Sequence, residues 1–84
     1  MYLHLGQSVV IEEKNLIGIF DLDNTTGSQI TRNFLRVAEK ENRVFNVSDE
    51  LPRSFVVCSD ENKLERNNIY TTQLTPQTLQ KRTV

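Results

Sequence analysis

The segment Leu16-Ile17-Gly18-Ile19-Phe20-Asp21-Leu22 decides the fold of this chain. A short, mostly apolar run bounded by polar turns is typical of a β-strand. On an extended chain its apolar residues fall on both sides, with Leu16, Phe20 and Leu22 on one and Ile17 and Ile19 on the other. We therefore expect a central strand, covered on both faces, in which Gly18 marks a bulge or a close backbone approach.

Before this strand, the sequence predicts a β-hairpin. Leu3 and Leu5 alternate with His4 in its first arm, Gly6 breaks the run, and residues 9–11 form the second arm. Residues 12–15 then make a polar turn into the strand that begins at Leu16.

After this strand, an amphipathic helix is predicted to run from the turn at residues 23–27 to about Asn42. Thr26 and Gln29 have the spacing of a capping box. The apolar face repeats at i, i+4, i+7 and i+8, through Ile30, Phe34, Val37 and Ala38, with Leu35 beside it.

The remaining sequence predicts strands at residues 43–47, 53–58 and 69–74. Residues 59–68 hold five charged side chains in ten and are predicted as a solvent loop. Thr75 and Pro76 are a favoured N-cap and first helical residue for a short C-terminal helical turn. The expected fold is α+β: a small, mostly antiparallel sheet of about five to six short strands with one amphipathic helix.

Length and composition limit what this domain can be. With 84 residues, the chain is expected to form a single domain over 1–84, and its 26 Leu, Ile, Val and Phe residues supply a core. A domain this small buries only ~60–65% of its unfolded surface. One helix covers one face of a sheet, so the other face or the open strand edges need a partner. Self-association is the economical solution, and a head-to-tail contact can close a ring.

Features of secreted, membrane or zinc proteins are not predicted. The longest apolar run, Phe55 to Cys58, has four residues, and the N-terminal sequence does not resemble a signal peptide. One cysteine excludes an internal disulfide framework, and one cysteine with one histidine cannot complete a Cys/His zinc site. We expect a cytoplasmic protein that needs no cofactor and contacts no membrane.

Catalysis is not expected. His4 and Cys58 lie in predicted strands and are interpreted as packed or surface residues. Asp21 and Asp23 could share a metal or a proton, but Asp is also common where a strand enters a turn. No acid, base and nucleophile converge, so a small metabolic enzyme is the least favoured class.

Positive charge is concentrated on the predicted helix. At ~100° per residue, Arg32, Arg36, Lys40 and Arg43 fall within ~80° of one another, whereas the apolar residues lie at ~140–240°. These cations form either an ordinary solvated face or a stripe that contacts phosphates. The net charge of −1 argues against a generally basic nucleic-acid binder.

Several segments in order are familiar from one family. They are residues 2–6 with Val9-Val10, residues 16–22, residues 53–57, Ile69-Tyr70 and residues 74–82. In their order and spacing the chain resembles the Rem-type extracellular-matrix regulators of Gram-positive bacteria, closest to the B branch. That resemblance implies a cytoplasmic transcriptional regulator of biofilm-matrix genes that binds double-stranded DNA as a ring of protomers, which are similar to LytTR-type domains.

The resemblance also implies where DNA contacts lie: basic residues just before the central strand and in the turn before the penultimate strand. Lys14 stands near the first position and Arg53 at the end of the second, while Glu50 and Leu51 occur where the A branch is rich in arginine. The first hypothesis is a DNA-binding homo-oligomer that uses Lys14 and Arg53, or the helix stripe. The alternative is an oligomeric scaffold or protein-interaction module without DNA affinity.

Overall fold

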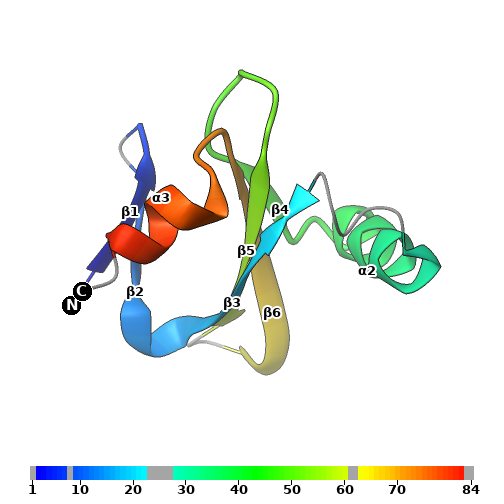
Figure 1. Cartoon of the computed structure of the whole chain (residues 1–84). Helices are drawn as coiled ribbons and strands as arrows, with labels where there is room; N and C mark the ends of the chain where they lie inside the picture. The colour runs from blue at the N-terminus through cyan, green and yellow to red at the C-terminus, as the bar shows by residue number, and fades with distance from the viewer. Residues whose placement is uncertain (1, 8, 23–27, 61–62, 83–84) are drawn as a thin grey trace.

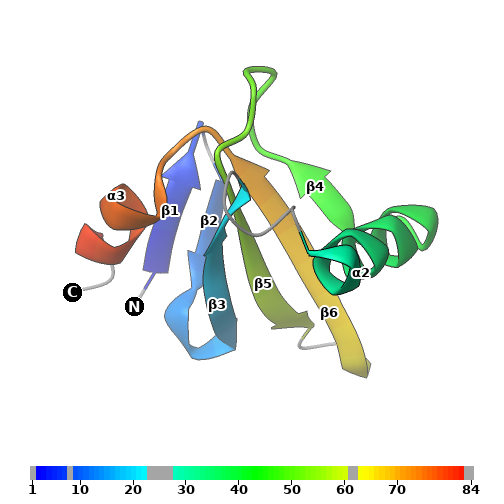
Figure 2. The same cartoon turned by 45° about the vertical axis from the view of Figure 1, so that its right-hand side comes forward.

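A computed structural model describes residues 2–7, 9–22, 28–60 and 63–82, and of 63–66 the backbone alone. In chain order its elements are β1 (Tyr2–Gly6), β2 (Val9–Glu12), the 3-10 turn η1 (Glu13–Asn15), β3 (Leu16–Asp21), α2 (Gln29–Lys40), β4 (Val44–Asn46), β5 (Ser54–Asp60), β6 (Lys63–Thr72) and α3 (Pro76–Lys81). The β1–β2 hairpin and α3 lie on one side of the four-stranded sheet and α2 on the other (Figures 1 and 2). This confirms the predicted α+β class.

The larger sheet has the strand order β3-β5-β6-β4. β4 pairs with β6 in parallel, and the other described pairings are antiparallel. The prediction that residues 16–22 form a central strand is wrong, because β3 lies at the sheet edge and Ile17 is 58% exposed. The two interior positions belong to β5 and β6, and in β5 five consecutive residues, 54–58, are buried.

The predicted irregularity at Gly18 is confirmed. The β3–β5 register shifts between Leu16 and Gly18. A Cβ atom added to Gly18 would lie 2.7 Å from Cε2 of Phe20, whose ring stacks on Phe55 with centroids 5.0 Å apart. Gly18 therefore lets the Phe20 ring lie flat over the edge strand.

The described residues between 59 and 68 belong to strands and not to a loop, which corrects the sequence prediction. β5 and β6 form a long antiparallel hairpin in which Cys58 faces Asn68, Ser59 faces Asn67 and Asp60 faces Lys63. Polar residues occupy this end of the hairpin, and its pairing satisfies the backbone groups that a solvated loop would leave to water. Charge density predicted solvent exposure but gave no information on strand pairing.

The helix ends differ from the predicted ones by a few residues. The N-cap of α2 is Ser28, whose Oγ accepts from the Thr31 N–H at 3.5 Å, and so the predicted cap at Thr26, outside the described residues, is wrong. At the other end Asn42 has a φ of +59°, and the N–H of Arg43 donates to the carbonyl of Ala38 at 2.9 Å. This is a Schellman ending, with Asn in the left-handed position usually taken by Gly.

The α3 prediction is confirmed. Thr75 is the N-cap, its Oγ1 accepts from the Thr78 N–H at 3.3 Å, and Pro76 follows at the start of the helix. Leu79 of this helix is fully buried. Among the described residues, no helix is long and apolar enough to cross a membrane.

Candidate functional site

The apolar face of α2 is only partly covered by the sheet. Ala38 is fully buried and Leu35 packs against the same cluster, but Ile30 is 82% exposed and Val37 51%. The helix therefore packs on the sheet through the side that carries Leu35 and Ala38. The predicted face of Ile30, Phe34, Val37 and Ala38 is correct in composition but wrong in orientation, because most of it points past the sheet edge.

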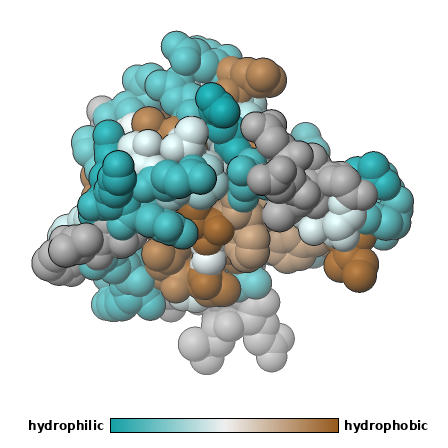
Figure 3. Space-filling model, viewed as in Figure 1, coloured by the Kyte–Doolittle hydropathy of each residue, from teal (hydrophilic) through white to brown (hydrophobic). Residues whose placement is uncertain are grey.

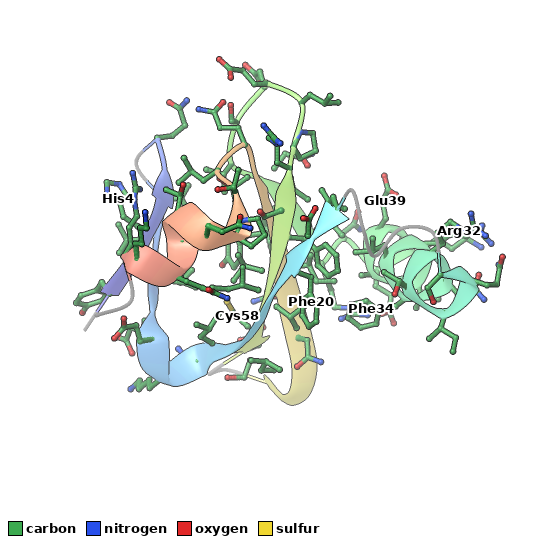
Figure 4. All side chains as sticks on the ribbon, viewed as in Figure 1. His4, Phe20, Arg32, Phe34, Glu39 and Cys58 are labelled. Carbon is green, nitrogen blue, oxygen red and sulfur yellow. The ribbon has the colours of Figure 1, made fainter. Side chains whose placement is uncertain are left out.

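A groove runs between the exposed part of α2 and the edge strand β3. Its volume is about 370 Å³, and its lining is mostly apolar: Ile17, Phe20, Ile30, Thr31, Phe34, Phe55, Val57 and Asn67. Phe20 from β3 and Phe34 from α2 approach each other across it (Figure 4). On the surface, hydrophobic side chains gather from the sheet edge towards α2 (Figure 3). The groove is an open apolar surface, floored by the buried side chains of Phe55 and Val57.

The helix cations divide into exposed and structural residues. Arg32 donates to Oε1 of Gln29 at 2.8 Å and projects away from the sheet (Figure 4). Arg36 and Lys40 are exposed, and within the described residues neither forms an ion pair shorter than 4.0 Å. These three residues make the basic surface of α2.

Arg43 does not belong to that surface. The helix ends at Lys40, so the helical angle predicted for Arg43 does not apply. Its side chain is 12% exposed, pairs with Oε1 of Glu41 at 2.7 Å, and donates from Nη1 to the carbonyl oxygen of Asn67 at 2.8 Å. Arg43 therefore fastens the end of α2 to β6.

Lys14 and Arg53 lie at opposite ends of the sheet. Lys14 precedes Leu16, which pairs with Cys58, and Arg53 precedes Ser54, which pairs with Asp21. At ~3.3 Å per residue, the seven residues of β5 separate the two cations by roughly 20 Å. They do not form one patch within a protomer.

The two cations also differ in their surroundings. Lys14 pairs with Oε2 of Glu12 at 3.2 Å in an exposed ion pair. The Arg53 backbone is fixed on both sides, since its N–H donates to Thr72 at 2.9 Å and its carbonyl accepts from Leu22 at 3.0 Å. Its exposed side chain lines a hollow of about 140 Å³ beside Asp21 and the first turn of α3. Arg53 thus carries an exposed charge on a backbone that is held by hydrogen bonds on both sides.

The turn between β4 and β5, where the resemblance implies a DNA contact, carries the most exposed large apolar side chain described, Leu51, at 87%. Asp49 and Glu50 beside it are exposed. The loop rises from the end of the sheet in both ribbon views (Figures 1 and 2). The sequence signal for this exposed side chain was a leucine between Glu50 and Pro52 in a predicted turn.

Comparison with known proteins identifies the family. No family model matches the chain. Extracellular matrix regulatory protein B of Bacillus subtilis (strain 168) is 33% identical over 82 residues, which cover 98% of this chain and 89% of that protein. The chain belongs to this family of Rem-type matrix regulators, B branch. The resemblance seen in the sequence is thereby confirmed.

Cys58, His4 and Asp21 are the other titratable residues that the sequence singled out, and they lie on three different strands. Burial raises the pKa of the Cys58 thiol to about 11, so the thiol is protonated at neutral pH. His4 is exposed on β1, with Nε2 3.3 Å from the carbonyl oxygen of Gln7. Asp21 lies at the end of β3, and Asp23 lies outside the described residues. Within the described residues, no three His, Cys, Asp or Glu side chains gather as metal ligands.

Proposed function

We propose that this chain is a DNA-binding transcriptional regulator of extracellular-matrix genes and that it acts as a homo-oligomeric ring in the cytoplasm, without catalytic activity. The observation that carries the proposal is the near full-length similarity to a protein named as an extracellular matrix regulator. The DNA contact assigned here is Arg53, supported by Lys14.

The exposed apolar surface supports self-association. Ile30, Phe34 and Val37 expose 82, 36 and 51% of their surface on a helix of 12 residues. Isolated helices of this length are marginal in water and depend on tertiary packing of an apolar face. A second protomer would supply that packing.

Self-association would also explain how a protomer without net positive charge could bind DNA. A protomer with a net charge of −1 and one exposed arginine at its sheet end binds phosphate weakly. Repeating Arg53 around a ring places several such cations along one duplex, and binding through linked sites raises the overall affinity by ~10²–10⁴ when the geometry permits simultaneous contact.

A mobility shift on duplex DNA, repeated over a range of salt concentrations, tests this function. The assembled protein should shift DNA at low salt and lose affinity steeply as salt rises. Arg53→Ala should weaken binding on all sequences and reduce the salt slope by about 1 for each phosphate that the arginine neutralised, without changing the oligomer. Arg36→Ala is the matched control and should do much less. If Arg36→Ala is the more damaging, the basic surface of α2 contacts the DNA instead.

The alternative is an oligomeric scaffold without DNA affinity. Glu50 and Leu51 favour it, because an acidic and an apolar side chain occupy the exposed turn before Arg53. No shift at low salt by the assembled wild-type protein would establish the scaffold and exclude the regulator.

A further inference from the structure

Two apolar features of the chain lack a partner within the described protomer, and they differ in shape. One is the groove between β3 and α2, walled by Ile17 and Phe20 on one side and by Ile30 and Phe34 on the other. The other is the Leu51 side chain, which projects alone from the β4–β5 turn with 87% exposed and so does not fill the groove of its own protomer. A concave and a convex apolar surface on one chain can meet only between copies.

The Leu51 turn is held in place before any partner binds. Oγ of Ser48 accepts from the Glu50 N–H at 3.1 Å and donates to Oε1 of Gln73 at 3.1 Å. After the turn, the Arg53 N–H donates to Thr72 at 2.9 Å. Because the turn is fastened at both ends, docking Leu51 costs little conformational entropy.

Charge complements this difference in shape. Asp49 and Glu50 directly precede Leu51 and are exposed. On α2, Lys40 lies three residues after the exposed Val37 and therefore borders the exposed apolar face of the helix. An acidic turn and an apolar helix face with a cation at its end are complementary for a head-to-tail contact.

We propose that the Leu51 turn of one copy seats in the groove between β3 and α2 of a second copy, with Asp49 and Glu50 on the side of Lys40. This rests on the homo-oligomer of the proposed function and specifies its two surfaces. The contact is heterologous, so repetition produces a ring or a filament rather than a closed dimer. Lys40 then contacts protein, which leaves Arg53 for phosphate.

Mixing two assembly-deficient variants tests the contact. Leu51→Asp removes the projecting side chain, and Ile30→Asp places a charge at the rim of the groove. Both sites are mainly solvent-exposed, so circular dichroism should show unchanged folds. By light scattering each variant alone should be a monomer of 9.7 kDa, while the mixture should form a 1:1 dimer of about twice that mass, because one intact turn and one intact groove remain. Val10→Asp, at a 49% exposed site on β2 outside the groove, is the control and should assemble like the wild type.

A charge exchange gives a second readout. Glu50→Lys should weaken assembly, and adding Lys40→Glu should restore part of it. If wild-type protein assembles and Leu51→Asp assembles equally well, or if the two monomeric variants do not dimerise when mixed, this contact is wrong while the ring and its DNA binding stand. A wild-type protein that assembles by this contact but never shifts DNA would refute only the proposed function.

Discussion

The two faces of the four-stranded sheet are covered to very different extents. On the face towards the hairpin and α3, the side chains of Leu3, Leu5, Val56 and Leu79 are all fully buried. On the face towards α2, Ile30, Phe34 and Val37 remain exposed beside a smaller buried cluster. The first will be called the closed face and the second the open face.

Contacts between distant parts of the sequence seal the closed face. Oγ1 of Thr72 donates to the carbonyl oxygen of Leu5 at 2.7 Å, and Nη1 of Arg82 donates to that of His4 at 3.2 Å. On the open face, the described part of the chain provides one helix, which meets the sheet mainly through Leu35 and Ala38. Apolar residues of similar chemistry are thus buried on the closed face and remain exposed on the open face.

Truncation of a large side chain should separate the faces most clearly. Leu5→Ala on the closed face is expected to lower the free energy of unfolding by about 2–5 kcal/mol, because it leaves a cavity in a fully buried cluster. Ile30→Ala on the open face should change it by less than about 0.5 kcal/mol. Urea denaturation measures both, in the Leu51→Asp background so that association does not contribute. Equal losses at the two sites would remove the distinction.

Substitution of two arginines near α2 should also lower the free energy of unfolding by different amounts, and this difference should be smaller. Arg43→Ala removes a nearly buried guanidinium together with its hydrogen bond to Asn67 and its pair with Glu41, and should cost about 1–3 kcal/mol. Arg36→Ala, at a site exposed on the basic surface of α2, should stay within about 0.5 kcal/mol. Thermal unfolding monitored by circular dichroism provides the comparison. A large loss on Arg36→Ala would show that this cation has a structural role.

Substitutions of the two helix N-caps should show the same difference between the faces, with smaller changes in the free energy of unfolding. Thr75→Ala should destabilise the protein by about 1 kcal/mol, because Thr75 caps the helix that seals the closed face with Leu79. Ser28→Ala should cost about 0.5 kcal/mol or less, since its cap contact is 3.5 Å long and α2 is less packed. Chemical denaturation midpoints report the order. The reverse order would mean that α2 contributes more to the fold of the protomer than its packing indicates.

The smallest effect at neutral pH concerns Cys58 on the closed face. Its folded pKa of about 11 is above the ordinary value of 9.0, so the native state holds the proton more tightly than the unfolded state. Stability from this group is complete below pH 9 and is lost as pH rises towards 11. Burial also raises the Tyr70 pKa, and this contributes in the same direction. Melting temperatures from pH 7 to 11 should fall less steeply for Cys58→Ala than for wild type. Parallel curves would contradict this.

Local patterns in the sequence predicted the local structure well. Alternation gave the β1–β2 hairpin, the 3.6-residue period gave α2, and Thr75 with Pro76 gave the start of α3. Each of these signals depends on residues within a few positions of one another.

The errors concern pairing and position in space. The apolar run from Leu16 to Leu22 reads the same whether its strand is central or at an edge. Ile17 is exposed because β3 lies at the sheet edge, which the run itself does not reveal. Arg43 follows the helical period in sequence, but the chain turns at Asn42 and redirects it. The groove requires β3 and α2 side by side, which no periodicity reports, so only its separate walls could be predicted.

Native-state hydrogen exchange of the unmodified protein at two concentrations tests the central claim most directly, namely that a second copy covers the open face. We predict that amides of residues 30–37 exchange more slowly as the concentration rises, while amides of residues 54–58 in β5 exchange at the same slow rate throughout. Exchange of residues 30–37 that is equally fast at every concentration, in a protein whose mass shows it to be assembled, would contradict the account.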